Sequence, residues 1–339
     1  MSERVLVTGV SGFLGGHVAL ALLRAGYRVR GSVRDLAKAA KVRETLARAG
    51  GDVDRLEFVA LDLLSDDGWA AAAEGCNHLQ HVASPFVIRM PKDRGDLVRP
   101  AVEGTRRAVE AGLAAGVNRL VVTSSIAAVV YGHPDYSRPC NEDDWTDLDG
   151  PGITAYTESK TRAERAAWSI VEAVGARDRL AVINPGAILG PLLDDDVGTS
   201  GSLVLRLLTG GVPAAPPVIL GYVDVRDVAD AHVLAMQRPE AGGRRFVVSG
   251  ETLSLMEIAE ALRVAFPAYA RKMPRFEMPL WFARLYATFD ASLRDASAEI
   301  GRRKRTDASA AERLLGRPLI PAREAAVETA RSILAQGLA

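Results

Sequence analysis

Short apolar runs rich in β-branched residues alternate with longer alanine- and leucine-rich segments through the first half of the chain. The short runs predict buried strands, and the longer segments have the length of helices that cross over a sheet. This alternation is typical of an α/β fold built on a doubly wound parallel sheet. The predicted strands are 4–8, 27–33, 56–60, 78–82, 119–123 and 179–183, and the predicted helices are 13–25, 36–49, 66–74, 94–115 and 153–174.

The pattern changes after Pro185. Gly and Pro cluster in 186–217, a strand and a helix are expected near 218–237, and another strand near 244–248. Open α/β sheets bind ligands at the carboxyl ends of their strands, so a second unit should cover that edge. We predict a Rossmann-type domain over 1–190, to which 218–248 returns, and a smaller, mainly helical substrate-binding lobe formed by 191–217 and 249–339.

A glycine-rich turn, Thr-Gly-Val-Ser-Gly-Phe-Leu-Gly, follows the first predicted strand and opens the first helix. The first glycine permits a tight turn, the second lets a pyrophosphate approach backbone N–H groups, and the third lets helix and strand pack closely. Three glycines can also serve only a tight connection, but their place between strand and helix favours a dinucleotide. The residues expected to hold it are Gly9, Ser11, Gly12, Phe13, Leu14 and Gly15.

The end of the second strand indicates which dinucleotide binds. An acidic residue there would accept from the ribose 2′-OH, whereas a basic one would hold a 2′-phosphate. This chain has Arg34, and Lys41 in the next helix could add a second positive charge, so the predicted cofactor is NADP (NADPH). The alternative is a solvated arginine that pairs with Asp35. Asp62, after the third strand, is expected beside the adenine with its neighbour Leu63.

Tyr156 and Lys160 are four residues apart in a predicted helix, so their side chains share one face. A nearby ammonium group makes a phenol a stronger acid, as proton transfer near neutrality requires. Tyr-x-x-x-Lys occurs by chance in many helices. Here Thr123, Ser124 and Ser125 end the fifth strand at the same edge of the sheet, and a serine there can hydrogen-bond a substrate oxygen.

Together these motifs resemble those of the extended short-chain dehydrogenases/reductases over nearly the whole chain. Val-Arg-Asp at 33–35, His-Val-Ala-Ser-Pro at 81–85 and Trp168 most resemble the branch of dihydroflavonol 4-reductases, cinnamoyl-CoA reductases and microbial aldehyde or ketone reductases. The resemblance implies NADPH-dependent reduction of a carbonyl, with catalytic Ser125 (favoured over Ser124), Tyr156 and Lys160. The further cofactor contacts that it implies are Val82, Ala83, Ser84, Thr123, Tyr156, Lys160, Pro185, Ala187, Ile188 and Ser202.

Two positions depart from relatives within that superfamily. Ala101 stands where nucleotide-sugar epimerases and dehydratases carry asparagine, and Val130 stands where plant dihydroflavonol reductases carry Asn or Asp. We therefore expect a fairly apolar or aromatic aldehyde or ketone as the small-molecule substrate. An epimerase or dehydratase, or an NADP-sensing regulator without catalysis, remain the alternatives. The residues expected near the substrate are Phe86, Val87, Ile126 and Tyr222.

Composition restricts the partners. Lys plus Arg and Asp plus Glu are 42 each among 339 residues, so no overall charge favours nucleic acid or an anionic membrane. The two cysteines and five histidines lack metal-ligand spacing, so no metal is expected. No run reaches membrane-spanning length and no apolar leader precedes Val5, which gives a cytoplasmic location as the expectation. A homodimer through the helices near 94–115 and 153–174 and a monomer both stay open.

Overall fold

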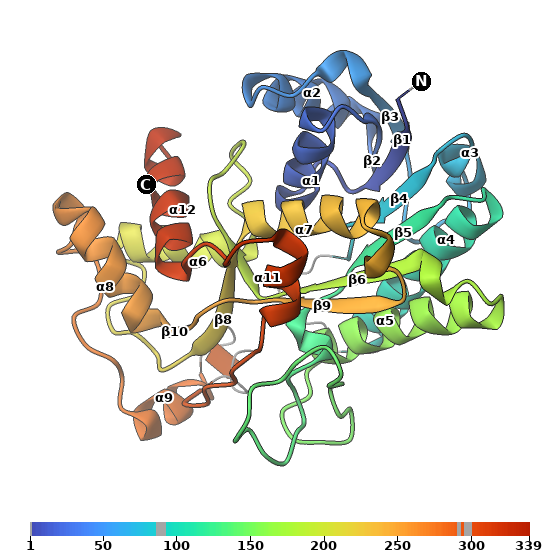
Figure 1. Ribbon diagram of the computed structural model, residues 1–339. Coiled ribbons are helices and arrows are strands. Elements are labelled where there is room, and N and C mark those ends of the chain that lie inside the picture. The colour runs from blue at the N-terminus through green and yellow to red at the C-terminus, as the bar shows by residue number, and fades with distance from the viewer. Residues whose placement is uncertain (1, 86–92, 290–292, 295–299) are drawn as a thin grey trace.

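The computed structural model describes residues 2–85, 93–289, 293–294 and 300–339. Its centre is a seven-stranded sheet in the order β3-β2-β1-β4-β5-β6-β9, in which every neighbouring pair is parallel (Figure 1). The order reverses between β1 and β4, which is where such sheets open a crevice for ligands. The strands are β1 (Arg4–Thr8), β2 (Arg28–Val33), β3 (Leu56–Ala60), β4 (His78–His81), β5 (Arg119–Thr123), β6 (Leu180–Pro185) and β9 (Arg244–Val248).

Helices cover both faces of this sheet because successive side chains of its strands point to opposite sides. In β1, Val5 and Val7 belong to one apolar core and Leu6 to the other. The fold is therefore the doubly wound Rossmann-type α/β architecture that the sequence predicted. The first core lies under α1 (Phe13–Arg24), α2 (Ala39–Arg48), α7 (Val225–Gln237) and α11 (Ser309–Leu315), and the second under α3 (Trp69–Ala73), α4 (Gly95–Ala114) and α5 (Ala155–Ala173).

A smaller region beside the sheet has an apolar core of its own, which contains Leu207, Ile258 and Ile333. It contains a three-stranded sheet in the order β10-β8-β7 as well as helices, so it is mixed in structure. Its elements are β7 (Ala187–Leu189), β8 (Ile219–Asp224), β10 (Thr252–Ser254), α6 (Gly198–Thr209), α8 (Leu255–Ala265), α9 (Leu280–Tyr286) and α12 (Ala322–Ala335).

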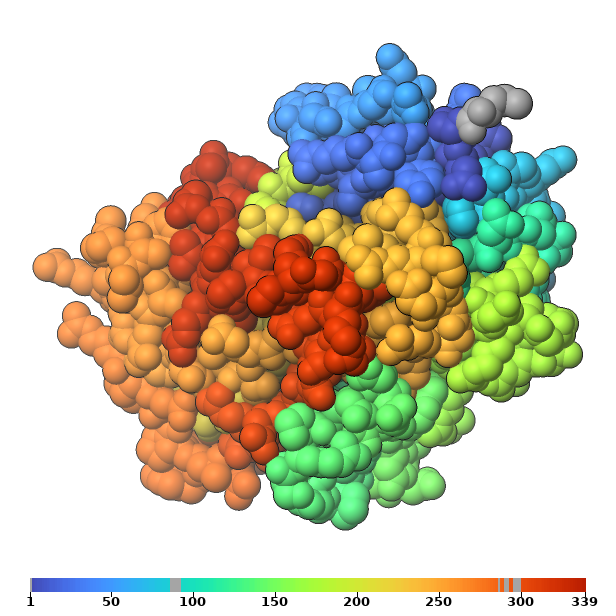
Figure 2. All heavy atoms as spheres, viewed as in Figure 1, coloured from blue at the N-terminus to red at the C-terminus, as the bar shows by residue number. Residues whose placement is uncertain are grey.

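Two buried aspartates hold the chain at the start of α7. Asp224 caps this helix by accepting from the backbone N–H of Arg226 (2.8 Å). Asp227 is completely buried and accepts from Arg317 (2.6 Å) and from the N–H of Ile320 (2.7 Å). Figure 2 shows the C-terminal segment (red) lying across α7 (gold) at this junction. The Val-Asp-Val-Arg-Asp stretch at 223–227 thus attaches the C-terminal segment to the large sheet.

The predicted elements occur in the predicted order, with three local differences. The helix expected at 36–49 begins with a 3₁₀ turn, η1 (Leu36–Lys38), because the Asp35 carboxylate accepts from the N–H of Ala37. The helix expected at 66–74 is only five residues long. Within 218–248, the segment expected to return to the Rossmann-type domain, α7 packs on the large sheet and β9 is one of its edge strands. β8 instead pairs with β7 and β10 in the smaller sheet. None of the helices described is long and apolar enough to cross a membrane.

Candidate active site

The turn after β1 needs glycine at two positions. Gly9 has a φ of 74°, in the left-handed region, and its carbonyl accepts from the N–H of Gly12 (3.1 Å). A Cβ on Gly15 would lie 2.0 Å from the carbonyl oxygen of Gly9, so only glycine lets α1 start so close to the turn. The first N–H groups of α1 have no partner inside the helix and are available to an anion.

A cleft of about 320 Å³ opens above this turn, between the ends of β1, β2 and β4. It brings together the glycine turn, Arg34, Leu63 and the segment 82–84, which the sequence assigned to one dinucleotide. Arg34 is exposed at its edge, where a phosphate could reach the guanidinium. The cleft therefore has room and backbone donors for a dinucleotide. Its lining is Thr8, Gly9, Ser11, Gly12, Phe13, Leu14, Gly15, Ser32, Val33, Arg34, Leu61, Leu63, Trp69, Val82, Ala83 and Ser84.

Thr8 and His81 fix the floor of the cleft. The Thr8 hydroxyl accepts from the N–H groups of Val82 and Ala83 (both 3.0 Å), which leaves its own proton for Nδ1 of His81, 3.0 Å away. Burial, and then the charge of Lys160, lower the pKa of His81 to about 3. The ring is thus neutral and can accept, and the ends of β1 and β4 are held together where the cofactor would lie.

Ser125, Tyr156 and Lys160 meet at the carboxyl end of β5. Ser125 caps the 3₁₀ turn η3 (Ile126–Ala128), and its Oγ lies 3.5 Å from the hydroxyl of Tyr156, the second residue of α5. Lys160 lies one turn later with its Nζ 6.0 Å from the centre of the tyrosine ring. Nζ donates to Ser84 Oγ (3.0 Å), a residue of the cofactor cleft. The catalytic candidates and the cleft therefore adjoin.

Thr154 sets the direction of α5 at this point. Its side chain accepts from the N–H of Thr157, whose own hydroxyl receives the N–H of Thr154, so the first turn is closed by a reciprocal cap. Tyr156 lies inside this capped turn and is 39% exposed, whereas Lys160 is buried. A substrate can reach the phenol, and the ammonium lies behind it.

Comparisons with known proteins show the family of the chain. The sequence pattern of the NAD dependent epimerase/dehydratase family matches residues 5–249. The chain belongs to that family. Cinnamoyl-CoA reductase 1 of Oryza sativa subsp. japonica is 39% identical over 271 residues, 79% of this chain and 77% of that protein. Ketoreductase azaE of Aspergillus niger is 33% identical over 303 residues, 82% of this chain and 87% of that protein.

Among solved structures, yeast methylglyoxal/isovaleraldehyde reductase Gre2 complexed with NADPH is similar over 98% of both chains, with a TM-score of 0.78 and 28% identity. These relatives place the chain among the extended short-chain dehydrogenases/reductases, in the branch of cinnamoyl-CoA reductases and Gre2-type reductases. It is an NAD(P)-dependent oxidoreductase of that branch, as the motifs in the sequence had suggested.

Three predicted cofactor contacts of this reductase have other partners in the structure. Lys41 pairs with Asp195, a contact that raises the pKa of its ammonium group. Asp62 accepts from the N–H of Leu64 (2.9 Å) in a local turn. Ser202 donates to the carbonyl of Thr199 (2.6 Å) inside α6. The partners of Asp62 and Ser202 lie two and three residues away, whereas Asp195 lies on a facing loop that spacing along the chain could not reveal.

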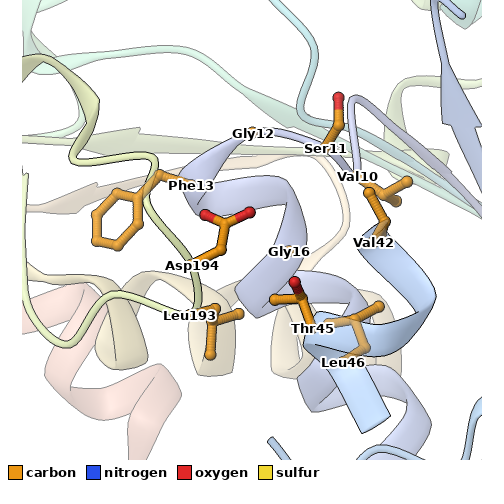
Figure 3. A pocket seen from close by; sticks show the side chains of 10 residues that line it. All are labelled: Val10, Ser11, Gly12, Phe13, Gly16, Val42, Thr45, Leu46, Leu193 and Asp194. Atoms are coloured by element: carbon orange, nitrogen blue, oxygen red, sulfur yellow. The ribbon is translucent and has the colours of Figure 1, made fainter. Parts of the chain in front are cut away.

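The loop after β7 reaches the glycine turn from the other side. Figure 3 shows Leu193 and Asp194 of this loop facing Val42 and Thr45 of α2, around a cavity of about 20 Å³. His17 of α1 holds the loop through the carbonyl of Pro191 (2.9 Å). Of the other expected contacts, Pro185 ends β6, Ala187 and Ile188 lie in β7, and Thr123 pairs with His232 (2.9 Å).

Sequence reasoning missed a buried polar group behind Ser125. Ser124 donates to Glu164 (2.5 Å), which also binds Asn184 and Arg245. The spacing gives one signal, because Glu164 follows Lys160 by one helical turn on the same face. Of the residues expected near the substrate, Ile126 and Tyr222 pack in apolar clusters, and Phe86 and Val87 lie outside the described residues.

Proposed function

We propose that this protein uses NADPH to reduce an aldehyde or ketone to the alcohol, reversibly, with Ser125, Tyr156 and Lys160 as its catalytic residues. One observation carries the proposal: the Tyr156 hydroxyl lies 3.5 Å from Ser125 Oγ, beside a buried lysine that reaches the cofactor cleft. A carbonyl oxygen placed between the two hydroxyls could accept from both of them. That arrangement orients and polarises the bond to be reduced.

Each residue has a separate part in the reaction. When bound, NADPH supplies the hydride that joins the carbonyl carbon. Ser125 donates a hydrogen bond to the carbonyl oxygen, and Tyr156 transfers its phenolic proton to that oxygen as the C–H bond forms. The ammonium of Lys160, 6.0 Å from the ring centre, stabilises the phenolate that remains. NADPH is oxidised, the carbonyl is reduced, and the tyrosine regains its proton from water.

Arg34 supports NADPH rather than NADH. Its neighbour Asp35 caps η1, so the carboxylate is engaged by backbone and not by the guanidinium. Arg34 lines the cleft from the end of β2, where a 2′-phosphate would be held by charge-assisted hydrogen bonds. Gre2, in the structure compared above, has NADPH bound.

The substrate side favours an apolar carbonyl compound. Val130, five residues after Ser125, is buried with Val129 and Val247 and offers no polar group to a hydroxylated ligand. Gly221 of β8 lies against both Ser249 and Ile126, since a Cβ there would be 2.4 Å from Ser249 Oγ and 3.5 Å from Ile126 Cδ1. The apolar Val130 supports an aliphatic or aromatic aldehyde or ketone over a sugar nucleotide, which needs many hydrogen-bond partners.

The test is oxidation of NADPH, followed by absorbance, with a panel of aldehydes and ketones for the wild type and Tyr156→Phe. The wild type should turn over at least one carbonyl, and the variant should lose about 100-fold or more in kcat while binding NADPH as before. Full activity in Tyr156→Phe would refute the assigned roles. Tightly retained NAD without net turnover would favour an epimerase, and binding of NADP without any chemistry would favour a regulator.

A further inference from the structure

Glu164 lies one helical turn after Lys160 in α5, and its side chain is completely buried. Its carboxylate accepts from Ser124 Oγ (2.5 Å) and Asn184 Nδ2 (2.7 Å) on one oxygen, and from Arg245 Nε (2.5 Å) and Trp168 Nε1 (3.4 Å) on the other. A buried charge persists only where it is paired and fully hydrogen-bonded. Four donors from four segments of the chain therefore converge on this one carboxylate.

Arg245 of β9 extends the same group of contacts toward the surface. Its Nη1 donates to the carbonyl oxygens of Glu142 (2.8 Å) and Asp144 (2.7 Å), and its guanidinium lies 3.8 Å from the centre of the Trp145 ring. Nη2 points to the carbonyl of Ala128 at 3.4 Å. The arginine thus joins the large sheet to the loop around 142–145 and to the turn η3 that follows the catalytic serine.

The same contacts determine the position of Ser125. Asn184 Nδ2, which binds Glu164, also donates to the carbonyl oxygen of Ser125 (3.2 Å). Thr146 is completely buried, and it donates from Oγ1 to the carbonyl of Ala127 (2.8 Å) and from its N–H to that of Ala128 (2.9 Å). The backbone around the Ser125 hydroxyl is therefore held by Asn184, which binds Glu164, and by Thr146 and Arg245, which both reach the carbonyl of Ala128.

We propose that Glu164 and Arg245 are positioning residues for the reaction. Glu164 belongs to the helix that carries Tyr156 and Lys160, and it binds Ser124, the neighbour of Ser125. The Glu164 carboxylate therefore fixes α5 to the end of β5 through Ser124 and to β9 through Arg245, and so holds the two hydroxyls at their separation of 3.5 Å. This inference rests on the proposed function, because it concerns the geometry of that catalytic set.

Glu164→Gln tests the idea with little change in side-chain volume. The amide keeps one acceptor oxygen, but its NH₂ group must face either Ser124 and Asn184 or Arg245 and Trp168, all of which donate. We expect kcat to fall about 10-fold or more, because a displacement of about 1 Å at a reacting group can cost about 100-fold. The KM for the carbonyl substrate and the Kd for NADPH should stay within about two-fold of the wild type.

Asp227→Asn is the matched control. Like Glu164, Asp227 is a completely buried carboxylate paired with an arginine, here Arg317 at the junction with the C-terminal segment, although Arg317 is 38% exposed and Arg245 only 7%. Both variants should lower the melting temperature, but only Glu164→Gln should lower kcat when both are assayed well below melting.

Ser124→Ala is a second test for the case in which Glu164→Gln does not fold, since it removes one hydrogen-bond donor to Glu164 and keeps the ion pair. We expect a loss of about three-fold or more in its kcat.

The outcomes separate this inference from the proposed function. A wild type without activity toward any carbonyl refutes the proposed function and this inference with it. An active wild type, with kcat unchanged in both Glu164→Gln and Ser124→Ala, refutes the inference alone. Equal losses of kcat in Glu164→Gln and Asp227→Asn would also refute it, because the loss would then come from general destabilisation of the fold and not from misalignment of the catalytic residues.

Discussion

Buried histidines should make this fold sensitive to mild acid. Burial lowers the pKa of His17 to about 4, although its hydrogen bond to Pro191 opposes the shift. Burial also lowers the pKa of His232 to about 3, and burial together with Lys160 lowers that of His81 to the same value. His81 and His232 each contact a hydroxyl at the cofactor edge of the sheet, from Thr8 and Thr123.

The sign of the effect follows from proton binding. An unfolded histidine titrates near pH 6.5, so below that pH the unfolded chain binds protons that the folded chain excludes. Stability therefore rises with pH in this range and is lost as the pH falls below about 6.5. Between pH 7 and pH 5 each of the three histidines should cost about 2 kcal/mol, or about 6 kcal/mol together. That is a large part of the roughly 5–15 kcal/mol by which a domain is stable.

Urea unfolding at pH 7 and pH 5, without cofactor, measures this difference. His17→Gln is the useful variant, because a glutamine amide can still donate to Pro191 and does not titrate. It should reduce the loss between the two pH values by about 2 kcal/mol. A wild type that loses less than about 2 kcal/mol in all, or a His17→Gln protein with an unchanged pH dependence, would contradict the reasoning.

Two predictions concern the cofactor cleft. Arg34→Ser should raise the KM for NADPH about 10-fold or more and leave the KM for NADH within about two-fold, because only the 2′-phosphate loses a charge-assisted partner. Initial rates with both cofactors measure this difference. Equal changes in the two KM values would count against the role assigned to Arg34. Gly15→Ala should abolish NADPH binding in a fluorescence titration, because its Cβ would lie 2.0 Å from the Gly9 carbonyl oxygen. The control variant Gly16→Ala should bind NADPH normally, because its Cβ would only approach Leu193 at 3.4 Å.

The regular part of this fold was predictable because it depends on local pattern. The central strands β1, β5 and β6 are buried on both faces and are mostly apolar runs, and the crossover helices have the apolar spacing that packing requires. The glycine turn was predictable for the same reason, since its conformation is set by residues within eight positions of one another. The cofactor edge follows from the order of the strands, and Arg34 follows from its place at the end of β2.

Contacts across the sheet were not predictable. Lys41 has the spacing of a second phosphate ligand, but a loop more than 150 residues later brings Asp195 to it. β8 has the pattern of a buried strand, and that pattern does not say which sheet it joins. Glu164 and Arg245 look like charged surface residues in the sequence, and only the packing of α5 on β6 and β9 buries them together.

The choice between two adjacent serines illustrates how the site is built. Neighbouring residues at the end of a strand point in opposite directions, so Ser124 and Ser125 cannot both face the cleft. Ser124 turns inward to Glu164, while Ser125 faces Tyr156. The inward serine is as important to the geometry as the outward one, because it joins the strand end that leads to one of the two proposed catalytic hydroxyls to the helix that carries the other. Removing either hydroxyl should therefore reduce turnover, the outward one by loss of a substrate contact and the inward one by loss of alignment.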